Sequence, residues 1–246
     1  MKPIIIAHRG WSGRYPQNTL LAIDKALDLP VDGIEFDLRR TKDGEIVLCH
    51  DDNVDPYANA SGYVRDFTLK ELKEMDFGSK KSAEFAGTQI AEFNEMLDLV
   101  SAKRPDIWLA VELKEDDEDL ARRAFKAVQE HGFGKQASVI SGHANMLRYL
   151  REIAPEVPRH GFNAHNMSGK EQEDYLELIN RVGVSIFDLN LRISDFYHYH
   201  KIMLDTWAPC NAAQYALARA CELESITTND PDVILAFQEQ PMPFGL

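Results

Sequence analysis

The chain has 246 residues, of which 44% are hydrophobic and 27% are charged, a composition that excludes a disordered protein. Its net charge of -13 would repel nucleic acid, and its mean hydropathy of -0.34 argues against stable insertion into a membrane. A small anionic substrate would feel the same negative field. Such a substrate would need a local positive centre, either a bound cation or inward-facing Arg and Lys side chains.

Eight strand-like segments alternate with helical stretches, a pattern typical of a parallel sheet. The expected strands are residues 4–8, 33–38, 107–114, 137–141, 160–163, 185–190, 202–207 and 225–228. Helices are predicted after the Asn18-Thr19 cap, from Glu118 to the stop at Gly132, and finally over residues 212–223. Eight strands with helical crossovers predict a single α/β domain, a (β/α)8 TIM barrel over residues 1–246.

Residues 52–88 interrupt this alternation. They combine turn-rich sequence with a short helical piece near residues 69–75, so we interpret them as a small insertion in an early βα connection. The apolar run before His8 is too short for a secretory leader, and the three widely spaced cysteines suggest neither disulfides nor a thiolate metal site. These features predict a cytoplasmic protein, and the sequence leaves its oligomeric state undetermined.

Acidic residues gather at the ends of two expected strands. Glu35 and Asp37 are two residues apart, so they share one face of their strand, and the third strand repeats this spacing with Glu112 and Lys114. If these side chains point into the barrel, three carboxylates form a site for a hard cation such as Mg²⁺ or Ca²⁺. The alternative is a structural cluster of ion pairs in which Lys114 neutralises Glu112.

Two histidines are expected at the same end of the barrel. His8 ends the first strand and His50 precedes Asp51. A histidine at a strand end is often a structural group. Cleavage of a phosphodiester, however, needs one group that takes a proton and another that gives one, and imidazole titrates nearest neutral pH.

Short motifs in this order resemble the glycerophosphodiester phosphodiesterases over nearly the full chain. They are His8-Arg9-Gly10, Pro16-Gln17-Asn18-Thr19, Glu35-Phe36-Asp37, Thr41-Lys42-Asp43-Gly44, His50-Asp51, Glu112-Leu113-Lys114 and Thr228-Asn229-Asp230-Pro231. Each motif is weak alone, but the order and spacing make the set specific. Gln17 departs from the family pattern, which usually has Glu at this position, so the charge that would hold Arg9 or His8 in place is lost.

The resemblance implies a TIM barrel and a role for individual residues. A divalent cation, Mg²⁺ or Ca²⁺, would be held by Glu35, Asp37 and Glu112. The acid and the base would be His8 and His50. Contacts to the substrate would come from Arg9 and Lys114, which match groups that bind the phosphate, and from Trp207, which matches an aromatic residue beside the substrate.

The resulting hypothesis is metal-dependent hydrolysis of a glycerophosphodiester to glycerol 3-phosphate and an alcohol. One alternative keeps the barrel and takes a lysophospholipid or a sugar phosphodiester. In that case Tyr57, Tyr63, Phe67 and Phe77 of the insertion would line an apolar path to the site or pack in the insertion's own core. The other alternative is a barrel that binds a phosphodiester without cleaving it.

One further sequence, Tyr197-His198-Tyr199-His200, would place two imidazoles on one face if it were extended. With no third ligand nearby, we expect a solvated connection before the seventh strand rather than a metal pair.

Overall fold

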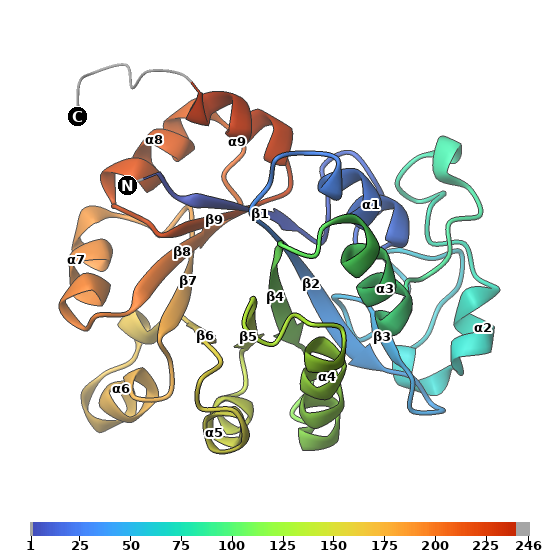
Figure 1. The fold of residues 1–246 in the computed structure, drawn as a ribbon, viewed down its shortest axis with the longest axis horizontal. Coiled ribbons are helices and arrows are strands. Elements are labelled where there is room, and N and C mark those ends of the chain that lie inside the picture. The colour runs from blue at the N-terminus through green and yellow to red at the C-terminus, as the bar shows by residue number, and fades with distance from the viewer. Residues whose placement is uncertain (1, 240–246) are drawn as a thin grey trace.

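The computed structural model describes residues 2–239 and forms a closed (β/α)8 barrel (Figure 1). Eight parallel strands follow the order β1-β9-β8-β7-β6-β5-β4-β2, and pairing of β1 with β2 closes the ring. The predicted fold class is therefore confirmed. Among residues 2–239, no helix has the length and apolar character needed to cross a membrane.

The strands are β1 (Ile4–His8), β2 (Gly33–Arg40), β3 (Ile46–Leu48), β4 (Trp108–Leu113), β5 (Ala137–Ser141), β6 (Arg159–Phe162), β7 (Arg181–Ser185), β8 (Met203–Trp207) and β9 (Ser225–Thr228). The α-helices are α1 (Leu20–Leu27), α2 (Leu69–Lys73), α3 (Phe93–Lys103), α4 (Glu118–Glu130), α5 (Ala144–Ile153), α6 (Gly169–Leu176), α7 (Leu191–Tyr199), α8 (Ala212–Ala220) and α9 (Pro231–Gln238). Three short 3-10 turns complete the structure: η1 (Val64–Asp66), η2 (Ala83–Phe85) and η3 (Ala164–Asn166).

Helix boundaries follow the local signals of the sequence. The Thr19 side chain accepts a hydrogen bond from the backbone N–H of Ala22, which caps α1 as predicted. Helix α4 buries Leu120, Ala124 and Val128 on one stripe and ends before Gly132, again as predicted. Helix α8 matches the expected helix but is not the last one, because Pro231 begins α9, with proline in the first turn where its missing N–H costs nothing.

The expected strand at residues 185–190 is wrong. Strand β7 lies at Arg181–Ser185, and the chain turns directly after it, leaving Phe187 86% exposed. The true strand is not a continuous apolar run, because Val182 and Val184 face the helices whereas Arg181 and Gly183 alternate with them. The more apolar sequence that follows is a turn.

Residues 197–200 are also different from the expectation. They form the end of α7 and its cap rather than a solvated connection, and Tyr197 is fully buried. Residues two apart on a helix point about 200° away from each other, so His198 and His200 do not share a face. The arrangement gives no pair of metal ligands.

The segment between β3 and α3 lies beside the barrel, next to β2 (Figure 1). Strand β3, which the sequence did not reveal, is only three residues long and pairs antiparallel with the end of β2. A separate apolar cluster fixes the segment; Phe77 is among its buried members, and Tyr57 and Phe67 pack against it. Tyr63 remains 46% exposed. Of the four aromatic residues considered for an apolar path, none lines the central cavity.

Candidate active site

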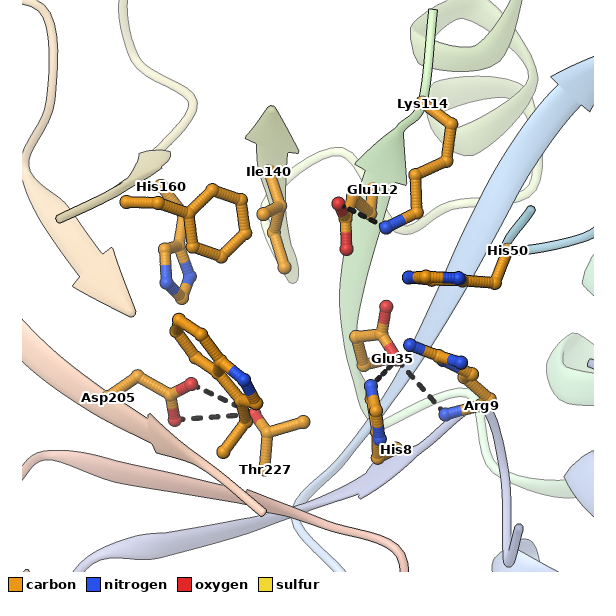
Figure 2. Close-up of a pocket in the computed structure, with 12 residues that line it drawn as sticks. His8, Arg9, Glu35, His50, Glu112, Lys114, Ile140, His160, Asp205 and Thr227 are labelled. Carbon is orange, nitrogen blue, oxygen red and sulfur yellow. Dashed lines mark hydrogen bonds and ion pairs between the residues drawn. The ribbon is translucent and has the colours of Figure 1, made fainter. Parts of the chain in front are cut away.

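A cavity opens inside the barrel at the carboxyl ends of the strands, where the side chains of several strands converge (Figure 2). In this fold family of barrels, functional sites are built at that end. The cavity is lined by His8, Arg9, Glu35, His50, Glu112, Lys114, Ile140, His160, Phe162, Asp205, Trp207 and Thr227. Asp37 lies directly behind this surface and is fully buried.

The register of β2 and β4 brings the three predicted carboxylates together. Asp37 on β2 is paired with Glu112 on β4, and Glu35 is two residues before Asp37 on the same inward face. One oxygen of each of these three side chains lies within 4.8 Å of the others. The structure therefore brings together the three carboxylates that their spacing in the sequence had grouped.

Two cations lie against the carboxylates. Arg9 Nε is 3.1 Å from Asp37 Oδ2, and Lys114 Nζ is 3.0 Å from Asp37 Oδ1 and 2.5 Å from Glu112 Oε1. Although burial opposes ionisation of Asp37, the charges of Arg9 and Lys114 lower its pKa to about 2. Glu35 differs, because burial and the charges of Asp37 and Glu112 raise its pKa well above the ordinary value.

Side chains behind the cluster hold these groups in place. Asn18 donates a hydrogen bond of 2.7 Å to Asp37, and the backbone N–H of Arg9 donates one of 3.0 Å to Glu35 Oε2. The Arg9 guanidinium donates to Gln17 Oε1 over 2.5 Å. Gln17 thus keeps the acceptor oxygen that the family's Glu would supply, without its charge.

His8 is fixed through one ring nitrogen. Its Nδ1 lies 2.6 Å from Asn229 Oδ1, and Nε2 lies 3.7 Å from Glu35 Oε2. Because Asn229 presents its oxygen, Nδ1 carries the proton and Nε2 is left free on the cavity side. Burial, assisted by the charge of Arg9, lowers the pKa of His8 to about 4.

His50 is fixed through a chain of hydrogen bonds from the segment after β3. Its Nδ1 lies 2.7 Å from Asp51 Oδ1, and Tyr57 donates its hydroxyl to Asp51 Oδ2 over 2.6 Å. Burial lowers the pKa of His50. The carboxylate behind the ring selects the Nδ1–H tautomer, so both predicted histidines leave Nε2 available.

The opposite side of the cavity has a different character. It contains the aromatic rings of Phe162 and Trp207, packed edge to face with centroids 5.4 Å apart, together with His160 and Asp205. Figure 2 shows His160 and Asp205 across the cavity from Lys114 and His50. Of these four residues the sequence prediction named only Trp207, although His160–Phe162 and Asp205–Trp207 repeat the two-residue spacing of Glu35–Asp37.

All eight predicted site residues therefore come together, seven lining the cavity and Asp37 directly beneath it.

The carboxylate cluster also fits a divalent cation. Glu35 Oε1 is buried and has no hydrogen-bond partner among residues 2–239, which leaves an oxygen available as a ligand. Three oxygen donors of this kind suit Mg²⁺ or Ca²⁺ better than a soft metal.

Comparisons with known proteins show the family to which this chain is similar. The model of the glycerophosphoryl diester phosphodiesterase family matches residues 8–233. A glycerophosphodiester phosphodiesterase of Caldanaerobacter subterraneus is 37% identical over 160 residues. This match covers 64% of this chain and 65% of that protein, which is just under two thirds of its length. The YhdW protein of Bacillus subtilis is 31% identical over 94% of this chain and 96% of its own length.

Among solved structures, an Oleispira antarctica phosphodiesterase in complex with the product sn-glycerol-3-phosphate superimposes with a TM-score of 0.88, at 21% identity and 97% coverage of both chains. The superposition shows that this chain shares the (β/α)8 fold of that phosphodiesterase. Within that fold class, it belongs to the glycerophosphoryl diester phosphodiesterase family.

Proposed function

We propose that the chain hydrolyses a glycerophosphodiester to glycerol 3-phosphate and an alcohol, with a bound divalent cation and two histidines. The observation that carries this proposal is the convergence of three carboxylates, two cationic side chains and two imidazoles in one cavity. The names of the relatives and the product bound to the Oleispira structure support the same substrate class.

Glu35, Asp37 and Glu112 would hold the cation, Mg²⁺ or Ca²⁺. When bound, a divalent cation stabilises the negative charge that develops on phosphate oxygens during cleavage. With all three carboxylates ionised, as a bound cation would favour, the positive charges of Arg9 and Lys114 leave the cluster with one net negative charge. A divalent cation would make this balance positive by one, which matches the single negative charge of a phosphodiester.

Arg9 and Lys114 have a second task in this proposal. Both lie at the cavity surface beside the carboxylates, and their side chains are mostly buried. Held there by Asp37, they would bind and orient the non-bridging phosphate oxygens. The low pKa of Asp37 keeps its charge available to both cations at neutral pH.

His8 and His50 would move the protons. The lowered pKa of His8, about 4, keeps its ring neutral at pH 7, which suits a base that takes the proton of the attacking oxygen. Asp51 behind His50 opposes the lowering of the His50 pKa by burial and stabilises the ring once it is protonated, which suits an acid that protonates the leaving alcohol. Both reactions would use the Nε2 atoms that face the cavity.

The test is release of glycerol 3-phosphate from a panel of glycerophosphodiesters by the full chain, with Mg²⁺, Ca²⁺, Mn²⁺ or EDTA. We expect cation-dependent release, and His8→Ala should lower kcat on the order of 10²–10⁴-fold, because one imidazole of an acid–base pair is lost. His200→Ala is the matched control, since this histidine is exposed and lies outside the cavity. No release from any diester, or full activity of a folded His8→Ala protein, would contradict the proposal.

A further inference from the structure

The side of the cavity away from the carboxylates contains a buried polar atom for which the proposed chemistry has no use. His160 on β6 is 4% exposed and lines the cavity, and its Nε2 has no hydrogen-bond partner among residues 2–239. Buried polar atoms in folded proteins are nearly always paired. An unpaired nitrogen on a ring that lines a cavity indicates a group that a ligand would satisfy.

The neighbouring strands leave space for this ring. Gly183 on β7 is in register with Phe162 on β6 and with Asp205 on β8. A Cβ atom at Gly183 would lie 2.7 Å from the Trp207 ring and 2.9 Å from His160 Nε2. Glycine at this position therefore allows both rings to lie over the backbone of β7, where they form one wall of the cavity.

The polar groups of this wall do not offer a free charge. Burial, with Arg181 nearby, lowers the pKa of His160 to about 3, so the ring is neutral. Burial raises the pKa of Asp205 to about 6, and its two oxygens accept hydrogen bonds from Thr227 at 3.3 and 3.0 Å. The buried Arg181 guanidinium balances the remaining charge of Asp205.

This environment selects among the alcohols that a phosphodiester can carry. A trimethylammonium group has no hydrogen-bond donor or acceptor, so it would leave His160 Nε2 unpaired. The edge-to-face contact of Phe162 with Trp207 also uses part of the aromatic surface that a cation would need. A hydroxyl group, in contrast, both donates and accepts, and the carbon skeleton of a polyol packs well on aromatic rings.

We propose that His160 is a specificity-determining residue whose imidazole binds a hydroxyl group of a polyol in the substrate, while Trp207 and Phe162 pack against the polyol's carbon skeleton. This inference rests on the proposed function and deepens it, because it names the chemistry of the group that lies opposite the phosphate-binding side. The hydroxyl belongs either to the leaving alcohol or to the glycerol that remains with the phosphate.

The experiment compares the full-length wild type with His160→Phe, which keeps an aromatic ring, and with His160→Gln, which keeps a donor and an acceptor. We would measure kcat and KM at saturating Mg²⁺ with glycerophosphoglycerol and with glycerophosphocholine. We expect kcat/KM of His160→Phe for glycerophosphoglycerol to fall roughly 10–100-fold, mainly through KM, because a hydroxyl then faces no partner. His160→Gln should recover part of this loss.

The substrates distinguish the two sources of the hydroxyl. A loss with glycerophosphoglycerol alone assigns the contact to the leaving alcohol. An equal loss with both diesters, together with weaker inhibition by sn-glycerol 3-phosphate, assigns it to the retained glycerol. Unchanged kinetics of folded His160→Phe with both diesters would overturn the inference.

A binding measurement separates this inference from the proposed function. If the wild type hydrolyses neither diester, the proposed function fails, and calorimetric titration with glycerophosphoglycerol still tests the subsite. A fall of roughly 10–100-fold in affinity for His160→Phe would support it. Equal affinities of wild type and variant would refute it.

Discussion

The two sides of the cavity use the same strand geometry for opposite chemistry. On β2 and β4, the residues two apart are Glu35 with Asp37 and Glu112 with Lys114, and Lys114 forms ion pairs of 3.0 Å with Asp37 and 2.5 Å with Glu112. On β6 and β8, the equivalent pairs are His160 with Phe162 and Asp205 with Trp207, and no ion pair joins them among the described residues. One side concentrates charge, and the other, called the neutral side below, presents the neutral His160 imidazole, aromatic rings and the Asp205 carboxyl, whose charge Arg181 balances.

This difference suits the proposed substrate, which has two unlike parts. A phosphodiester has an anionic centre flanked by neutral alcohols, and each part needs a different environment. Strong charges next to one another are tolerated on the first side because each carboxylate has a cation or an amide nearby. On the second side, burial without a compensating ligand keeps His160 neutral.

The largest difference between the sides should appear in cation binding. Glu35→Gln keeps the shape of the side chain and removes its charge from the carboxylate cluster. We expect the affinity for Mg²⁺ or Ca²⁺ to fall by at least 10–100-fold. Changing only a group that supports a metal ligand already lowers affinity by about this factor, and Glu35 is a proposed ligand itself. Calorimetric titration of the metal measures this directly.

Asp205→Asn is the matched control, because Asp205 is equally buried but lies on the other side. It should leave the affinity for the cation unchanged. Unaltered affinity in Glu35→Gln would remove Glu35 from the cation site. A similar loss in both variants would show that the two sides are not separate in function.

The sequence predicted the charged side in full and the neutral side only at Trp207. Carboxylates in an apolar strand are conspicuous because burial of a charge is costly, so their two-residue spacing signals a site. Buried histidine, threonine and aromatic residues are ordinary components of a core, and nothing in their local sequence distinguishes a cavity wall from packing. Which of them line the cavity depends on the register of β6 to β9.

The fold was predictable for a related reason. Strand positions came from apolar runs, which report the outer faces that pack against the helices. Strand β7 was misplaced because Arg181 and Gly183 on its inner face break that run, and β3 is too short to give a pattern. The prediction therefore failed, both for strand β7 and for the residues of the neutral side, where the inner face of the barrel has few carboxylates.

Acid sensitivity would sharpen the comparison from the neutral side. The folded pKa of His160 is about 3 and the ordinary value is 6.5, so below pH 6.5 the unfolded chain binds a proton that the folded protein does not. Stability from this residue is thus lost as pH falls from 6.5 toward 3. At pH 5 the loss should be about 2 kcal/mol relative to pH 7.

His160→Gln removes this titration, so its free energy of unfolding should decline less between pH 7 and pH 5 than that of the wild type. Urea denaturation at both pH values measures the difference. His200→Gln, which replaces an exposed histidine, should retain the wild-type decline. If His160→Gln also keeps the full wild-type decline, the imidazole is not held neutral in the folded protein.

The smallest effect is expected at Tyr57, which reaches the charged side only through Asp51 and His50. Tyr57→Phe removes the hydroxyl that donates a hydrogen bond to Asp51. Because hydrogen bonds to charged groups are strong, we expect the loss of this one to lower kcat roughly tenfold. Because that hydrogen bond also lowers the pKa of Asp51, the acidic limb of the pH–rate profile should move to higher pH.

Tyr63→Phe in the same segment is the control, since Tyr63 is 46% exposed and lies away from the cavity. It should reproduce the wild-type rate and pH profile. A purely structural role of Tyr57 would lower the melting temperature and leave the acidic limb in place. In that event the segment after β3 packs against the barrel without orienting His50. The residues of the barrel strands and of the turns directly after them would then suffice for the function of the charged side.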